Sequence, residues 1–216
     1  MKTLKHILVS IVYLCIMDIK NNIFKAAFDL FLKYGIKSVS MDDICRKMAI
    51  SKKTLYESIT NKDELVSEIV ERHIATDRLE IQDLLKSSNN ALEEMVNISN
   101  HIIKFLGRIS PSLTYDLKKY HPQTWDKIEN NHFHFIHDVI FNNIKKGQKE
   151  GNYRKDISPE IISILYIYMT RGITDETYFP QDSFPKVTLY KQLISYHIYG
   201  IVTPQGREML TKLKFD

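Results

Sequence analysis

The sequence predicts an all-α protein, and three observations lead to that fold class. Only 7 glycines and 6 prolines occur in 216 residues, which leaves few turns for a many-stranded sheet. Apolar residues recur at steps of three and four along much of the chain, as they do on one face of a helix. No stretch of the sequence alternates strictly between apolar and polar residues. The apolar fraction of 44% indicates a globular helical protein rather than a disordered chain.

Residues 1–17 differ from the sequence that follows. They contain two lysines and then a run, 7–17, that is apolar except for Ser10, which is similar to the start of a signal peptide. No small-residue cleavage site follows, and the run is shorter than the roughly 20 apolar residues that span a bilayer. We favour an added N-terminal helix or a mis-assigned start upstream of Met17. Export and membrane association remain alternatives. Under the favoured interpretation we expect no membrane partner.

Four helices are predicted before residue 86, each with a recognisable start or end. Gly35 follows apolar residues at helical spacing and ends the first helix as a C-cap. Ser40 and Asp43 stand at the two positions of a capping box, and Ser51 and Asn61 occupy later N-cap positions. These signals place helices at 18–34, 41–48, 52–58 and 61–85.

The remainder of the chain is also predicted to be helical, with breaks at prolines, glycines and polar loops. The boundary between an N-terminal head and a larger body should lie inside the 61–85 helix, because no flexible linker is apparent. Further helices are expected at 91–107, 111–120, 122–149, 158–178, 186–200 and 205–214.

The second and third helices are too short to be stable alone, because isolated helices of this length are marginal in water. Their apolar residues are spaced to pack against the first helix, with a tight turn at 49–51 between them. This pattern predicts a helix-turn-helix, whose second helix enters the major groove of DNA by its N-terminal end. Lysines and hydroxyl groups at that end can reach phosphates and base edges. Lys62, at the start of the next helix, is predicted to clamp a phosphate together with backbone N–H groups.

The distribution of charge fits this interpretation. Residues 1–64 contain 11 basic and 7 acidic side chains, whereas residues 65–216 contain 19 of each. The whole excess of +4 therefore lies in the N-terminal third, as expected for a small polyanion-binding head on a neutral body.

Residues 20–65 resemble the DNA-binding domain of the TetR family of transcriptional regulators. The residues that carry the resemblance are Tyr34-Gly35, Ser40-Met41-Asp42-Asp43-Ile44, Ala49-Ile50-Ser51, Thr54-Leu55-Tyr56 and Asn61-Lys62-Asp63-Glu64-Leu65. The resemblance implies that Thr54, Tyr56 and Lys62 contact DNA and that the body binds an effector and dimerises. The full set of predicted DNA-binding residues is Ser40, Ser51, Lys52, Lys53, Thr54, Tyr56 and Lys62.

Two residues depart from the family pattern. Glycine is usual where Ala49 stands, and alanine costs up to about 1 kcal/mol if that residue is left-handed. Phenylalanine is usual where Ile59 stands, and isoleucine can still fill an apolar pocket there. Both departures are compatible with the resemblance.

The body carries a candidate dimer interface. Residues 161–169 are apolar around nearly the whole circumference of a helix, which predicts burial on all sides. Together with 189–199 they suit a four-helix contact between two chains; burial in the core of a single chain is the alternative. A dimer would place two recognition helices on half-sites about 34 Å apart. The predicted interface residues are Ile161, Leu165, Tyr168, Leu193 and Tyr196.

Aromatic density is the guide to an effector pocket, although most of these rings are more typical of a helical core than of a pocket. The predicted pocket residues are Tyr115, Tyr120, Trp125, Phe133, His134, His137 and Tyr166. His134 and His137 share a helix face, but no third ligand is placed beside them, so no metal is predicted. No cofactor motif or catalytic motif is present, and we do not expect an enzyme.

The sequence thus predicts a cytoplasmic homodimeric transcriptional regulator. It would repress from a pseudo-palindromic double-stranded DNA operator and be released by an unidentified small-molecule effector. The two distant cysteines, Cys15 and Cys45, suit a reducing compartment. The predicted organisation is an extra segment at 1–17, a helix-turn-helix domain at 18–65 and an effector-binding and dimerisation domain at 66–216. The alternative is a membrane-tethered or exported helical binding protein with a vestigial helix-turn-helix.

Overall fold

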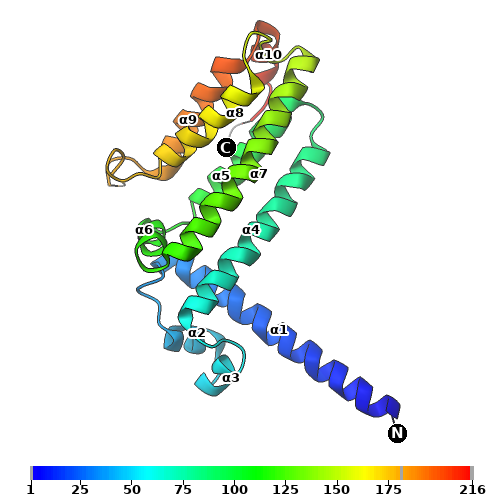
Figure 1. Cartoon of the computed structure of the whole chain (residues 1–216), viewed down its shortest axis with the longest axis vertical. Coiled ribbons are helices and arrows are strands. Elements are labelled where there is room, and N and C mark those ends of the chain that lie inside the picture. Colours follow the sequence, from blue (N-terminus) through cyan, green and yellow to red (C-terminus); the bar gives the residue numbers. More distant parts are fainter. Residues whose placement is uncertain (1, 181, 215–216) are drawn as a thin grey trace. The chain divides into compact units, whose positions relative to one another are not determined.

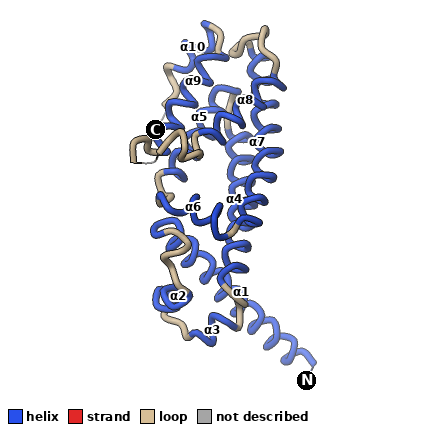
Figure 2. The backbone as a smooth tube through the Cα atoms, turned by 60° about the vertical axis from the view of Figure 1, so that its left-hand side comes forward, coloured by secondary structure: helices blue, strands red, loops and turns tan. Residues whose placement is uncertain are grey.

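The structure is a computed structural model that describes residues 2–180 and 182–214, with side chains for most residues from Asp18 onward. Within this part of the chain the regular structure consists of helices, and no strand is present, so the all-α prediction is confirmed (Figures 1 and 2). The helices are α1 (Lys2–Tyr34), α2 (Met41–Met48), α3 (Lys52–Tyr56), α4 (Lys62–Ser87), α5 (Ala91–Leu106), α6 (Pro111–Tyr120), α7 (Pro122–Glu150), α8 (Pro159–Gly172), α9 (Lys186–Ile201) and α10 (Pro204–Leu210).

Most helix boundaries agree with the sequence prediction to within two residues, and three do not: the start of α1, the end of α8, and the end of α10, which lies at Leu210, four residues before the predicted end. α1 begins at Lys2 instead of residue 18, because no proline or glycine interrupts the chain before Gly35. α8 ends at Gly172, six residues before the predicted end. Asp175 forms a local turn there, in which its carboxylate accepts the Thr177 N–H at 2.9 Å. Short polar side chains of this kind compete with the helix for backbone hydrogen bonds.

The chain divides into two compact units. The first contains the chain up to His73 together with Ile109–Asp126, and the second contains Ile74–Arg108 and the chain from Lys127 onward. α6 therefore belongs to the same unit as the helix-turn-helix, whereas the sequence had assigned it to the body. α4 and α7 each contribute residues to both units.

The first unit is built around the C-terminal half of α1, which contacts α2 and α6. Phe31 of α1 is buried, as are Ile44 of α2, Leu55 of α3 and Ile59 in the turn after it. They are among the apolar residues predicted to pack the two short helices against α1, and α2 and α3 lie next to each other (Figure 2). The tertiary contacts supply the stability that helices of this length lack by themselves.

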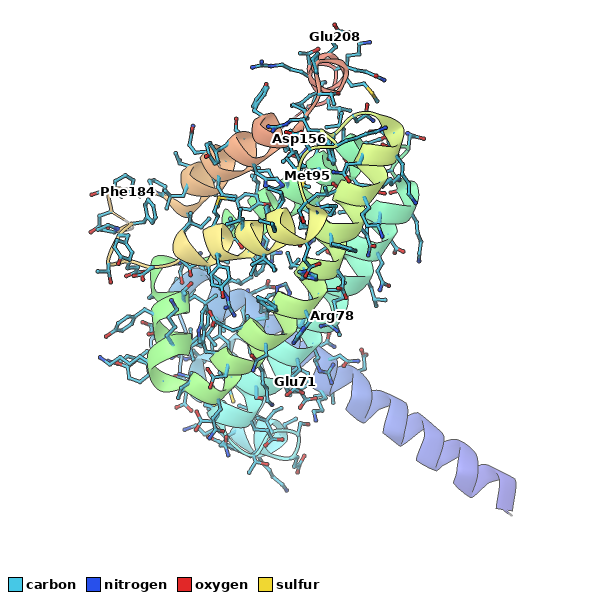
Figure 3. The ribbon with its side chains drawn as sticks, turned by 45° about the horizontal axis from the view of Figure 1, so that its top comes forward. Glu71, Arg78, Met95, Asp156, Phe184 and Glu208 are labelled. Carbon is cyan, nitrogen blue, oxygen red and sulfur yellow. The ribbon has the colours of Figure 1, made fainter. Side chains whose placement is uncertain are left out.

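The second unit is a helical bundle with a continuous apolar core. Leu92 and Met95 of α5, Ile144 of α7, and Ile194 and Ile198 of α9 are each no more than 1% exposed. Figure 3 shows Met95 among these helices, with Phe184 in the loop between α8 and α9, where it is 43% exposed.

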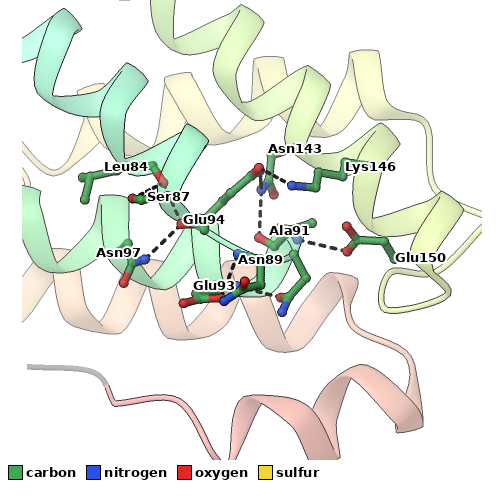
Figure 4. Close-up of polar contacts among 12 residues, drawn as sticks. Leu84, Ser87, Asn89, Ala91, Glu93, Glu94, Asn97, Asn143, Lys146 and Glu150 are labelled. Atoms are coloured by element: carbon green, nitrogen blue, oxygen red, sulfur yellow. Dashed lines mark hydrogen bonds and ion pairs between the residues drawn. The ribbon is translucent and has the colours of Figure 1, made fainter.

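A buried polar network closes one end of this bundle (Figure 4). The Glu94 carboxylate is 5% exposed and accepts hydrogen bonds from Asn143 Nδ2 at 2.8 Å and Lys146 Nζ at 2.6 Å. Asn143 Nδ2 also donates to the Ala91 carbonyl, and the Tyr153 hydroxyl donates to Asn143 Oδ1 and to the same carbonyl. Burial of these groups is tolerable because each has hydrogen-bond partners.

Candidate nucleic-acid interface

α2 begins with a complete capping box. The Ser40 hydroxyl oxygen accepts the Asp43 N–H at 3.2 Å, and the Asp43 carboxylate accepts the Ser40 N–H at 2.8 Å. The Ser40 hydroxyl also donates to that carboxylate at 2.6 Å. These hydrogen bonds lower the pKa of Asp43, because they favour its charged form. The capping box predicted from the sequence is confirmed, and the Ser40 side chain is exposed at the start of the helix.

The turn between α2 and α3 depends on one left-handed residue. Ala49 has φ 54° and ψ 38°, and the Ile50 N–H donates to the Cys45 carbonyl at 3.1 Å to close the turn. This is the position where the family usually has glycine. The alanine therefore carries the strain of up to about 1 kcal/mol expected for an L-residue in this region.

α3 presents a polar edge to solvent while its other face is anchored. Ser51 is the N-cap, with its hydroxyl oxygen accepting the Thr54 N–H at 3.1 Å and lying 2.9 Å from the Thr54 hydroxyl. Leu55 is fully buried, whereas Tyr56 is 50% exposed. The helix ends at Tyr56, two residues before the predicted end.

The lysines of α3 are exposed, and one has an acidic neighbour. Lys52 Nζ lies 2.8 Å from Asp42 Oδ1, and this contact raises the pKa of Lys52. Both side chains of the pair are more than half exposed, so the ion pair is weak and can be exchanged for a stronger anionic partner. Lys53 is exposed on the same short helix. The arrangement leaves ammonium, hydroxyl and phenol groups accessible along one edge.

Lys62 does not follow the prediction of a phosphate clamp. Its ammonium group is partly buried and donates to the backbone carbonyls of Ile36 and Val39, in the loop between α1 and α2. It also lies 6.0 Å from the centroid of the Phe31 ring. Desolvation lowers the pKa of Lys62. In this structure the side chain therefore binds the protein's own backbone.

The predicted pocket residues are divided between the two units. Tyr115, Tyr120 and Trp125 belong to the first unit; both tyrosines are exposed, and the Tyr115 hydroxyl accepts a hydrogen bond from Lys119 Nζ at 2.6 Å. The predicted pocket residues in the second unit are Phe133, His134, His137 and Tyr166. The two exposed tyrosines are therefore surface residues, in contrast to the prediction from aromatic density.

The four residues in the second unit have different surroundings. The His137 ring stacks with Phe133 at 6.4 Å and with Phe141 at 5.9 Å between centroids, while His134 is exposed. Tyr166 is 2% exposed. His137 Nε2 lies 3.4 Å from Glu160, and within the described residues no group of histidine, cysteine and acidic side chains could hold a metal ion.

A buried polar cluster around Tyr166 was missed by the sequence analysis. The Tyr166 and Tyr190 hydroxyls lie 3.0 Å apart, and Tyr190 is also hydrogen-bonded to Ser99. The His197 ring meets Tyr166 edge-on at 4.9 Å and is 4% exposed, and burial lowers its pKa to about 4. Among the described residues, none forms a hydrogen bond with His197 Nε2. The available signal was a polar side chain on the apolar face of each helix: Ser99 lies four residues from Met95 and Ile103, and His197 lies four residues from Leu193 and Ile201.

The predicted dimer residues fall into two groups. Four of them are exposed in the single chain: Ile161 at 59%, Leu165 at 49%, Tyr168 at 61% and Tyr196 at 76%. Leu193 is only 8% exposed and packs in the core of its own unit, so its assignment to the interface was wrong. α8 therefore has one buried and one exposed apolar face in the single chain, which speaks against the alternative that the whole helix is buried in the core of one chain. In the described part of the chain, no helix has the length and apolarity needed to cross a membrane.

The sequence comparisons agree with the helix-turn-helix geometry. Residues 23–69 match the family model described as bacterial regulatory proteins, tetR family. The chain is 24% identical over 175 residues to YvaF, an uncharacterized HTH-type transcriptional regulator of Bacillus subtilis, covering 78% of this chain and 88% of the relative. It is 25% identical over 158 residues to the HTH-type transcriptional regulator UidR of Escherichia coli, covering 71% of this chain and 79% of UidR.

Solved structures share the fold across both units. A TetR-family transcriptional regulator from Agrobacterium tumefaciens superposes with a TM-score of 0.66 at 15% identity, covering 87% of this chain and 100% of that one. A protein from Saccharomonospora viridis, described as a transcriptional regulator in complex with choline, gives a TM-score of 0.65 at 18% identity, covering 87% and 99%. At these identities the likeness establishes the fold.

Proposed function

We propose, from the premise that this chain is a helix-turn-helix transcriptional regulator of the TetR family, that it acts in the cytoplasm as a homodimeric repressor released by a small molecule. The observation that carries this proposal is the exposed polar edge of α3. Leu55 and Ile59 are 0% and 1% exposed and anchor one face of α3 in the core. The opposite face of the helix is therefore fixed in position but remains accessible to solvent. A rigid, exposed and basic helix edge is what entry into the major groove requires.

Each group on that edge has a distinct role in the proposed complex. Lys52 and Lys53 would bind phosphates or guanine edges, and Lys52 would leave Asp42 to do so. Tyr56 would reach the backbone with its hydroxyl group. Ser51 and Thr54 already share a local hydrogen bond, and their hydroxyl groups keep acceptor capacity for the DNA. Ser40, exposed at the start of α2, would contact a neighbouring phosphate.

A second copy of the chain would cover the exposed apolar face of α8 and α9. Ile161, Leu165, Tyr168 and Tyr196 are all between 49% and 76% exposed. Large apolar side chains gathered on adjacent helices commonly mark an interface, and a two-fold dimer buries the same patch on both partners. Two recognition helices could then meet half-sites about 34 Å apart.

The effector would bind in the second unit, near the buried polar cluster. A buried nitrogen without a hydrogen-bond partner is costly, and a ligand that donates to or accepts from His197 Nε2 would remove that cost. Tyr166, one of the predicted pocket residues, stands beside it with its hydroxyl bonded to Tyr190. The choline complex of the Saccharomonospora viridis protein shows that a protein of similar fold binds a small molecule. Effector and operator would oppose each other through a coupling of about 1–3 kcal/mol.

The test is the selection of genomic DNA fragments by the purified protein, followed by gel-shift titration of the fragments that are retained. The double variant Lys53→Ala, Tyr56→Ala should bind DNA at least tenfold more weakly, because both polar groups are removed from the exposed edge of α3 while Leu55 still anchors the helix. The matched control is the double replacement of Lys155 and Tyr178, an exposed lysine and an exposed tyrosine of the second unit. Equal affinity of the α3 variant and the wild type would contradict the proposal.

A further inference from the structure

We propose that Lys62 positions the loop that leads into α2, and does not act as a phosphate ligand; this inference rests on the proposed DNA-binding function. The loop, residues 35–40, joins α1 to the capping box of α2. Its course decides where α2 starts, and α2 supports α3 through direct contact.

The first argument is the direction of the Lys62 ammonium group. It donates to the carbonyls of Ile36 and Val39, which lie 26 and 23 residues away in sequence. Val39 directly precedes Ser40, the N-cap of α2, so the second bond holds the residue from which the helix starts. An ammonium group has three donors, and two of them are used here. One donor is left for any other partner, and the partial burial of the side chain limits its access to a DNA phosphate.

The second argument is that the same loop is also held by α6. The Lys37 N–H donates to Asp116 Oδ2 at 2.8 Å, and Asp116 is 3% exposed. Gly35, with φ 79°, lies so close to α6 that a Cβ there would be 2.3 Å from Ser112 Oγ. The loop is thus clamped between a lysine of α4 and an aspartate of α6. The negative charge of Asp116 also favours the charged form of Lys62 and opposes the effect of its burial.

The two possible roles of Lys62 differ in salt dependence. A lysine that neutralises one phosphate contributes about 0.9 to the slope of log affinity against log salt concentration, whereas a positioning residue contributes nothing to that slope. Affinities of wild type, Lys62→Met and Lys53→Met for one retained operator fragment should be measured between low and moderate salt. Lys53→Met is the matched control, because its lysine is exposed on the α3 edge.

We expect Lys62→Met to weaken binding at least tenfold with an unchanged slope. We expect Lys53→Met to lower the magnitude of the slope by about 0.9. A slope lowered by about 0.9 in Lys62→Met would overturn the inference. So would an unchanged affinity.

Amide hydrogen exchange of the free protein tests the positioning role without any DNA. In Lys62→Met the amides of Lys37, Val39 and Ser40 should exchange at least tenfold faster, while those of Leu65 and Val66 in α4 stay unchanged. Lys53→Met should leave all five as in wild type. Unchanged exchange at the loop amides would reject the inference even if the protein binds DNA. Conversely, failure of the wild type to retain any DNA would reject the proposed function and leave this measurement valid.

Discussion

The side-chain hydrogen bonds that cap α2 and α3 in the first unit and those that join α5 and α7 in the second unit lie in different environments. In the first unit the capping groups are largely accessible: Ser40 and Ser51 cap α2 and α3 from exposed positions. In the second unit Glu94 of α5 and Asn143 of α7 form a hydrogen bond inside the core, where they are 5% and 2% exposed. An exposed cap contributes about 1 kcal/mol, whereas breaking a buried polar network leaves groups unsatisfied and costs several times more. The comparison predicts that the DNA-binding unit is the more easily rearranged of the two.

The largest expected effect is the loss of Asn143. Asn143→Ala removes one hydrogen-bond donor from Glu94 and an acceptor from Tyr153, both within the core. The free energy of unfolding of the second unit should fall by about 3 kcal/mol. This change is measured by denaturant titration, with hydrogen exchange of the amides in α5 and α9 as the readout. Asn142→Ala, at an exposed position beside it, is the control and should change the free energy of unfolding by less than about 0.5 kcal/mol.

The next effect concerns pH and the second unit again. The folded-state pKa of His197 is about 4, below the unfolded value of about 6.5, so the unfolded chain binds an extra proton between these values. Stability is therefore full above pH 6.5 and falls as the pH drops. This one group should lower the free energy of unfolding by about 2 kcal/mol between pH 7.5 and pH 5.

His197→Phe isolates this contribution, because any steric cost of the larger ring is independent of pH and cancels in the difference. His101 acts with the opposite sign, since its hydrogen bond to Asp77 at 2.6 Å raises its pKa. That contribution is present at low pH and is lost as the pH rises through the folded-state pKa, and it is common to both proteins. If the wild type and His197→Phe showed the same loss between pH 7.5 and pH 5, the buried neutral imidazole would be the wrong explanation.

The smallest of these effects belongs to the first unit. Ser51→Ala removes the N-cap of α3 and should lower the free energy of unfolding of that unit by about 1 kcal/mol. The only tryptophan of the sequence, Trp125, lies in the first unit, so its fluorescence reports on this unit. Ser195→Ala, which replaces an exposed serine of α9, is the control and should leave the denaturant midpoint of the Trp125 fluorescence transition unchanged. A Ser51→Ala loss as large as that of Asn143→Ala would remove the distinction between the two units.

Contacts between residues close in sequence were predictable, as the capping residues show. Ser40 and Asp43 form hydrogen bonds with each other, and Ser51 accepts a hydrogen bond from an amide three residues later. Both partners of each bond therefore lie within one short stretch of the sequence. The cost of a left-handed Ala49 was considered because the resembled family usually has glycine there, and the structure shows the residue in that conformation. The match to the TetR family model covers residues 23–69, which include these positions.

Contacts between distant residues were not predictable in the same way. The partners of Lys62 are 23 and 26 residues away, and no local pattern links a lysine to those two carbonyls. The hydroxyl groups of Tyr166 and Tyr190 form a hydrogen bond although the two residues are 24 positions apart, and the Tyr166 ring also contacts the His197 ring of α9. Leu193 and Leu165 are both apolar, yet one is buried and the other is exposed.

The sequence by itself determined the helices of this protein, the helix-turn-helix and the groups exposed on its second helix. These features follow from apolar periodicity and helix capping, which depend on interactions between residues within one or two turns of a helix. Only the tertiary structure decided that Lys62 binds a backbone loop, that α6 packs with the first unit and that α8 keeps an exposed apolar face. Those outcomes depend on which distant surfaces meet and exclude water, and a linear pattern of residue types does not specify that choice.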